Sequence, residues 1–278
     1  MSVFVDPEVR ERVERLDASE IPFNRYGYDP YGISREHLGL FFTFLARLYK
    51  NYFSVRVEGI ENVPRRGRGV VVGNHSGGIA LDGGMVLASL LLEMDPPRLG
   101  HGMVEKFAIQ FPYISKWFNR VGQLTGLPEH AIRVLEDERL LMVFPEGARG
   151  TAKLFWERHT LVSFGTGFMR LALQTGSPIV PFAFLGAGEA IPTVMNLRRL
   201  GKLLGAPYIP VTPYLLPVPL PVSCKIVYGE PMRFEGTGNE ADEVVHAYVE
   251  QVRARIGNLI AQGRGKGSST DAWEGGES

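Results

Sequence analysis

The sequence predicts an α/β fold: a mixed, mainly parallel sheet flanked by helices, with an N-terminal amphipathic helix. Two patterns predict it, namely short apolar runs typical of buried strands and longer segments with apolar residues at helical spacing. The two patterns alternate through most of the chain, as they do in proteins built on a mainly parallel sheet. Composition agrees, since 45% of the 278 residues are hydrophobic and 22% are charged, which is ordinary for a globular protein.

The individual elements follow from these patterns in chain order. Ser34 is a suitable N-cap for an aromatic-rich helix that runs to about Tyr52. Asp82 is expected to cap a helix that runs through Met94 and ends before Pro96-Pro97. The other expected helices are 7–16, 111–119, 128–136, 165–175 and 240–261, and the expected strands are 54–58, 69–73, 98–104, 140–144, 178–184 and 223–228.

Charge and cysteine content exclude several classes of function. Basic and acidic residues number 30 each, so global charge gives no argument for nucleic-acid binding. The single cysteine, Cys224, excludes an intrachain disulfide and a multi-cysteine metal site. The histidines lack metal-ligand spacing, so no metal and no bound cofactor is expected.

The sequence shows neither a signal-peptide pattern nor a membrane-spanning apolar run, which predicts a cytoplasmic protein, soluble or peripheral to the membrane.

The first polar motif, Asn74-His75-Ser76-Gly77-Gly78-Ile79-Ala80-Leu81-Asp82, follows a predicted strand. A neutral imidazole can take a proton from an attacking alcohol, and a carboxylate on its other nitrogen would fix the tautomer and stabilise the imidazolium. Gly77 and Gly78 allow the loop to fold back and bring Asp82 to His75. The alternative is a loop histidine beside a helix-capping aspartate, which this motif alone favours.

The second polar motif, Phe144-Pro145-Glu146-Gly147-Ala148-Arg149, follows another apolar run. Two strand ends thus deliver polar groups to what we expect to be one edge of the sheet, where ligands bind in open α/β folds. The alternative is a strand-end turn with a solvated salt bridge of little energetic value. A third apolar strand, Pro178-Ile179-Val180-Pro181, follows.

These three elements, in this order, resemble the glycerolipid acyltransferase superfamily, typified by bacterial 1-acylglycerol-3-phosphate acyltransferases. The resemblance spans roughly residues 55–230. It implies an α/β fold and transfer of a fatty acyl group from acyl-CoA or acyl-carrier protein to the hydroxyl of a lipid. It gives His75 the role of base and Asp82 the role of orienting carboxylate.

The same resemblance implies a substrate-binding group around the dyad. Glu146, Gly147 and Arg149 would contact the acceptor, and Asn74 would join them. Backbone donors near Gly147 or in the Gly77-Gly78 loop would stabilise the oxyanion.

The chain departs from the family pattern at two places. Six residues separate His75 from Asp82, where the family usually has four, which is closer to the diacylglycerol-acyltransferase-like branch. The family's phosphate-binding arginine has no clear counterpart in Gly122–Pro128, and Arg133 could substitute only if its helix points it inward. The acceptor is therefore either a lysophospholipid or a neutral glycerolipid.

We expect three parts: an N-terminal helical segment (1–53), an acyltransferase domain (54–262) and a disordered tail (263–278). The 34–52 helix either lies in a membrane interface or packs on the core. Arg198, Arg199 and Lys202 either meet anionic headgroups or CoA phosphates, or form a solvated face.

Together these features predict a peripheral membrane acyltransferase of lipid metabolism, such as phospholipid biosynthesis. Its partners would be acyl-CoA or acyl-carrier protein, a lipid acceptor and a membrane surface. A thioester or lipid hydrolase using the same dyad, and a non-catalytic lipid-binding protein, are the alternatives. The longer offset between His75 and Asp82 keeps the second alternative open.

Overall fold

The computed structural model describes residues 2–19, 21–77, 80–104, 112–125, 127–203 and 205–265. Within these residues seven strands form one sheet in the order β1-β9-β6-β2-β5-β3-β4. They are β1 (Arg56–Glu58), β2 (Gly69–Gly73), β3 (Gly100–Val104), β4 (Leu124–Thr125), β5 (Leu140–Val143), β6 (Ile179–Leu185) and β9 (Lys225–Tyr228). All neighbouring strands run parallel except β6 and β9, which confirms the predicted mixed, mainly parallel sheet.

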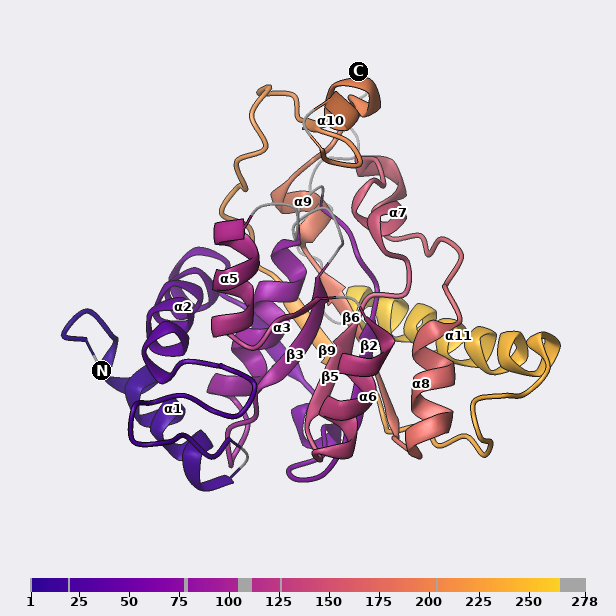
Figure 1. Ribbon diagram of the computed structural model, residues 1–278. Coiled ribbons are helices and arrows are strands. Elements are labelled where there is room, and N and C mark those ends of the chain that lie inside the picture. The colour runs from indigo at the N-terminus through magenta and orange to yellow at the C-terminus, as the bar shows by residue number, and fades with distance from the viewer. Residues whose placement is uncertain are drawn as a thin grey trace, which may run out of the picture.

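Helices cover both faces of this sheet (Figure 1). One face carries α1 (Pro7–Ser19), α2 (Arg35–Arg47), α3 (Leu81–Leu92) and α5 (Pro112–Arg120). The other carries α6 (Pro128–Glu136), α8 (Gly167–Thr175) and α11 (Asp242–Gly265). Because both faces are covered, the central strands are apolar on both sides. In β2, Val71 belongs to the core cluster of the first face, whereas Val70 and Val72 belong to that of the second.

The N-terminal helices share the core of the sheet. Val9 of α1 and Phe42 of α2 are buried in one cluster with Met85 of α3. The core-packing interpretation of the 34–52 helix is therefore the one that the structure supports. Ser34 caps α2 as predicted, with its Oγ accepting the N–H of His37, and a π-helical turn (Leu48–Tyr52) continues from it.

Several expected boundaries need correction. Helix α3 has Ala80, and not Asp82, at its N-cap, because the Asp82 side chain bonds to other groups described below. Residues 263–265, which we assigned to the tail, are part of α11, and residues 266–278 lie outside those described. The patterns also miss short elements, namely α7 (Ala148–Thr151), α9 (Ala187–Ala190), β7 (Met195–Asn196), α10 (Arg198–Leu203) and β8 (Pro210–Val211).

The sheet topology brings three strand ends together. Strands β6, β2 and β5 are adjacent and parallel, so their carboxyl ends meet at one edge. Asn74 follows β2, Phe144 follows β5 and Gly186 follows β6. The two polar motifs therefore occupy the same edge, as expected from the rule for open α/β sheets.

Candidate active site

His75 and Asp82 are joined by a hydrogen bond at the carboxyl end of β2. The distance from His75 Nδ1 to Asp82 Oδ2 is 2.8 Å. Asp82 is wholly buried, whereas His75 keeps 9% of its surface exposed. A carboxylate only accepts hydrogen bonds, so Nδ1 carries the proton and Nε2 presents a lone pair. No hydrogen bond to Nε2 is found among the described residues, which leaves this nitrogen available to a substrate.

Asp82 reaches His75 despite the longer spacing because it lies in the first turn of α3 and not at its cap. Its Oδ2 also accepts the N–H of Ser76 at 3.0 Å, and its Oδ1 accepts the N–H of Gly83 at 2.8 Å. Gly77 turns the loop with a φ of +88°, and a Cβ there would lie 2.5 Å from the carbonyl oxygen of Ala187. Three donors thus fix the carboxylate before any substrate binds.

The imidazole ring is held by an aromatic neighbour as well. Phe144, from the second motif, stacks on His75 with ring centroids 4.2 Å apart and planes inclined by 19°. Phe144 in turn meets Phe182 of β6 edge-on, at 5.7 Å. This contact leaves the ring little freedom to rotate about its side-chain bonds.

Asn74 fastens the start of the same loop to β6. Its Nδ2 donates to the carbonyl oxygen of Phe184 at 2.9 Å, and its Oδ1 accepts the Phe184 N–H at 2.7 Å. The side chain therefore extends the β2–β6 pairing by one step beyond the end of β2. Both polar atoms of the Asn74 amide are bonded to the main chain of β6. We therefore infer that Asn74 positions the loop and does not bind substrate.

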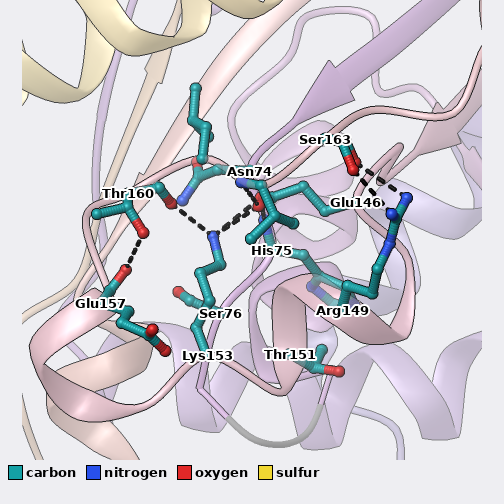
Figure 2. A network of polar contacts seen from close by, with 12 residues as sticks. Asn74, His75, Ser76, Glu146, Arg149, Thr151, Lys153, Glu157, Thr160 and Ser163 are labelled. Atoms are coloured by element: carbon teal, nitrogen blue, oxygen red, sulfur yellow. Dashed lines mark hydrogen bonds and ion pairs between the residues drawn. The ribbon is translucent and has the colours of Figure 1, made fainter.

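Glu146 lies at the centre of a buried polar network (Figure 2). Its Oε1 accepts the main-chain N–H of His75 at 2.9 Å, and its Oε2 accepts the N–H of Val162, also at 2.9 Å. Lys153 lies 2.8 Å from Oε2 and 3.0 Å from Oε1 and also donates to the carbonyl oxygen of Thr160. These contacts join the histidine loop to the chain around residues 153–162.

Gly147 and Arg149 complete the second motif. Gly147 combines a φ of 55° with a ψ of −149°, a conformation essentially reserved for glycine. Arg149 is exposed and is turned toward Ser163, donating to its Oγ at 2.7 Å and to its carbonyl oxygen at 3.1 Å (Figure 2). The motif thus brings Glu146 to His75, whereas Arg149 points toward the 160–165 loop.

The structure does not bring Arg133 to this group. Arg133 lies on α6 with its guanidinium over the ring of Tyr31, and it lines a separate cavity of about 300 Å³ together with His101 and Gln123. The lining of that cavity contains no residue of the two motifs. Gly78, the remaining predicted site residue, lies outside the described residues.

Lys153 is the site residue that the sequence did not reveal. It lies seven positions after Glu146, and the chain between them contains only the short helix α7, so no helical or strand periodicity relates the two side chains. Only the structure supplies the signal: Lys153 has 5% of its surface exposed, and lysines are rarely buried unless they are paired with a carboxylate.

The sequence model of the family described as Acyltransferase matches residues 54–185, which contain both motifs. The chain belongs to this family and is an enzyme of the acyltransferase class. The family resemblance predicted from the motifs is confirmed.

Particular relatives include uncharacterized mycobacterial proteins. One from Mycobacterium tuberculosis (strain ATCC 25618 / H37Rv) is 34% identical over 247 residues, covering 84% of this chain and 67% of its own length. One from Mycobacterium leprae is 34% identical over 244 residues, covering 84% and 65%. A chicken (Gallus gallus) protein named "DGAT1/2-independent enzyme synthesizing storage lipids" is 24% identical over 192 residues, covering 68% and 54%.

A solved structure shares the fold. It is the 1-acyl-sn-glycerophosphate (LPA) acyltransferase PlsC from Thermotoga maritima, with a TM-score of 0.57 at 20% sequence identity, covering 84% of this chain and 81% of the other. In the part of this chain that the structure describes, none of the helices is long and apolar enough to cross a bilayer. Nor do the described residues include a group of three or more His, Cys, Asp or Glu side chains that could hold a metal ion.

Proposed function

We propose that this enzyme moves a fatty acyl group from an acyl-CoA or acyl-carrier-protein thioester to the hydroxyl of a lipid, at the cytoplasmic face of a membrane. The observation that carries the proposal is the buried His75–Asp82 pair, with Nδ1 fixed at 2.8 Å and Nε2 open. Family membership supplies the class of reaction, and this geometry supplies the base.

The proton balance of the reaction follows from the two ring nitrogens. Nε2 of His75 takes the proton of the acceptor hydroxyl while the oxygen attacks the thioester carbonyl. Asp82 stabilises the imidazolium through Nδ1. When the carbon–sulfur bond breaks, the imidazolium returns the proton to the leaving thiolate. The products are the acylated lipid and free thiol, and His75 is neutral again.

In this scheme Glu146 has a positioning role and does not touch the reacting atoms. Both of its oxygens hold donors of the protein itself, including the main-chain N–H of His75. We therefore infer that Glu146 and Asn74 set where His75 lies, and that the acceptor is met by groups nearer the surface, such as Gly147 and the exposed Arg149.

An apolar cavity provides room for an acyl chain. It measures about 410 Å³ and is lined by residues of α6 and α8 and by Val143 of β5 and Pro145. Its lining includes Met103, Ile132 and Phe168. Pro145 also lines this cavity and directly follows the Phe144 that stacks on His75, so the cavity adjoins the second motif.

A neutral glycerolipid is the acceptor that we favour over a lysophospholipid. Arg133, the candidate for binding a phosphate, lies in a different cavity. The name of the chicken relative refers to storage lipids, which supports a neutral acceptor.

The test is release of free thiol from a long-chain acyl-CoA, with and without added diacylglycerol or lysophosphatidate, repeated with acyl-carrier protein as donor. We expect thiol release that depends on the acceptor and falls by about 10²- to 10⁴-fold in His75→Ala. Thiol release at the same rate without any acceptor would identify a hydrolase. Full activity of a folded His75→Ala protein would refute the proposed base.

A further inference from the structure

The segment 190–224 differs in charge from the rest of the chain. All 30 acidic residues lie outside it, whereas it contains Arg198, Arg199 and Lys202. These three cations are exposed on or beside α10, and no ion pair to them is found among the described residues. The segment therefore carries a net positive charge even though the whole chain is neutral.

The same segment also exposes leucines and a valine. Leu203 of α10 is 81% exposed, and Leu215 in the loop after β8 is 76% exposed. The larger apolar set on this segment is Leu200, Leu203, Leu215, Leu216, Val218 and Leu220. Six large apolar side chains exposed within one segment are the kind of feature that marks a binding surface.

The loop that carries Leu215 and Leu216 is held in place by hydrogen bonds. Thr212 Oγ1 donates to the carbonyl oxygen of Leu216 at 2.8 Å, and Tyr214 donates its hydroxyl to the carbonyl oxygen of Val218 at 2.7 Å. Tyr52, at the end of the π-helical turn, donates to the carbonyl oxygen of Pro219 at 2.7 Å. The outward direction of these side chains is thus set by the fold, which lowers the entropy lost when they bind.

This surface lies at the same edge as the candidate active site. The segment follows β6 and α9, and Figure 1 shows α10 beyond the carboxyl ends of the strands, at the same end as α7. The N–H of Phe155 donates to the carbonyl oxygen of Thr193 at 2.8 Å, and Asn196 Nδ2 donates to the carbonyl oxygen of Ala152 at 2.6 Å. The segment is therefore attached to the chain that follows Glu146.

From these observations we propose that the 190–224 segment docks on a bilayer containing anionic lipids. The leucines would enter the interface while Arg198, Arg199 and Lys202 meet the headgroups. Docking there would place His75 beside the membrane that supplies the acceptor, and only this consequence rests on the proposed function. Helix α2 is not the docking element, since its apolar face is buried and Phe44 is the large apolar side chain that it exposes most.

The test is co-sedimentation of the full chain with vesicles of phosphatidylcholine alone or mixed with phosphatidylglycerol. We expect binding to the mixed vesicles that weakens with salt. The triple variant Arg198→Gln/Arg199→Gln/Lys202→Gln should lose about fivefold in affinity per charge removed. Leu215→Asn/Leu216→Asn should lose about tenfold or more, since two apolar side chains no longer enter the interface.

Two matched controls separate this surface from others. Arg65→Gln/Arg66→Gln removes two exposed charges from the turn before β2, at the opposite edge of the sheet, and should leave binding unchanged. Phe44→Asn tests α2 and should also leave it unchanged. His75→Ala should bind vesicles as the wild type does, so a failure of the proposed chemistry would not affect this result.

Three results would overturn the proposal. They are unchanged vesicle binding in both 190–224 variants, loss of binding in Phe44→Asn, and absence of binding to either vesicle. If self-association, measured by sedimentation velocity, is instead lost in the leucine variant, the surface is an interface between copies of this chain.

Discussion

Two buried histidines, His75 and His101, are each held through Nδ1 at 2.8 Å, but by different acceptors. His75 bonds to the carboxylate of Asp82, whereas His101, within β3, bonds to the carbonyl oxygen of Gly122. Burial, reinforced by the positive charge of Arg139, lowers the pKa of His101 to about 3. Its Nε2 is buried and has no hydrogen-bond partner in the described part of the chain.

The difference shows which surroundings would suit a buried imidazole to act as a base. A carboxylate compensates the charge of an imidazolium, whereas a carbonyl dipole does so weakly and a nearby arginine opposes it. His75 also retains exposed surface at 9%, against 1% for His101. His101 is therefore confined to the neutral form at neutral pH, whereas the surroundings of His75 suit the role of base that we propose for it.

The largest expected effect comes from making His75 resemble His101. Asp82→Asn keeps a polar side chain of the same size but removes the charge that supports the imidazolium and selects the tautomer. Acyl transfer at neutral pH should fall by about 10³- to 10⁴-fold, as expected for a His–Asp pair. The measurement is kcat for acyl transfer, with circular dichroism to verify folding. Activity within tenfold of the wild type would show that Asp82 plays no part in proton transfer.

The next effect concerns the buried ion pair of Glu146 and Lys153, which lies against the main chain of His75. Lys153→Met leaves Glu146 buried without its cation, which should lower the free energy of unfolding by about 3–5 kcal/mol. The double variant Glu146→Gln/Lys153→Met removes both charges and should recover most of that loss. Urea unfolding measures both.

Lys50→Met is the matched control, because Lys50 pairs with Glu8 where both side chains are more than 40% exposed. That change should cost about 1 kcal/mol or less. Equal losses for Lys153→Met and Lys50→Met would contradict the buried network.

The smallest effect is on pH dependence, at His101. The folded protein keeps His101 neutral down to about pH 3, whereas the unfolded chain protonates it near pH 6.5. Between these values the unfolded state binds one more proton, so acid favours unfolding by about 1.4 kcal/mol per pH unit. His101→Asn should reduce this slope and leave acyl transfer at neutral pH within about twofold. Urea unfolding from pH 7 to 4 measures it, and an identical slope in the variant would refute the assignment.

Much of the fold could be predicted because the sheet is buried on both faces. Apolar runs such as Val70–Val72 and Leu140–Val143 identified β2 and β5, and helical periodicity identified α6, α8 and α11. The sequence could not place α7 or α10, since four and six residues are too short for a periodic pattern. It left Asp82 with two roles, a helix cap or a partner of His75, because the partner that a side chain binds depends on the loop geometry, which the sequence alone does not define.

The site was predictable where its residues lie in contiguous motifs. His75 and Asp82 lie in one motif and Glu146 in the other, and the strand topology brings the two motifs together. Lys153 could not be predicted, because the chain between Glu146 and Lys153 has no regular periodicity that would place the two side chains together. Arg133 is a candidate for the phosphate-binding arginine only from its position in the sequence after Gly122–Pro128. In the structure its guanidinium lies over the ring of Tyr31 instead.

The most direct test of the central claim is acyl transfer from a labelled acyl-CoA into a total lipid extract, followed by lipid mass spectrometry of wild type and His75→Ala. The account predicts a new acylated lipid formed by the wild type and lost in the variant, with His101→Asn still forming it. The same product at the same yield from the His75→Ala protein would contradict the account, because the acyl transfer would then proceed without the proposed base.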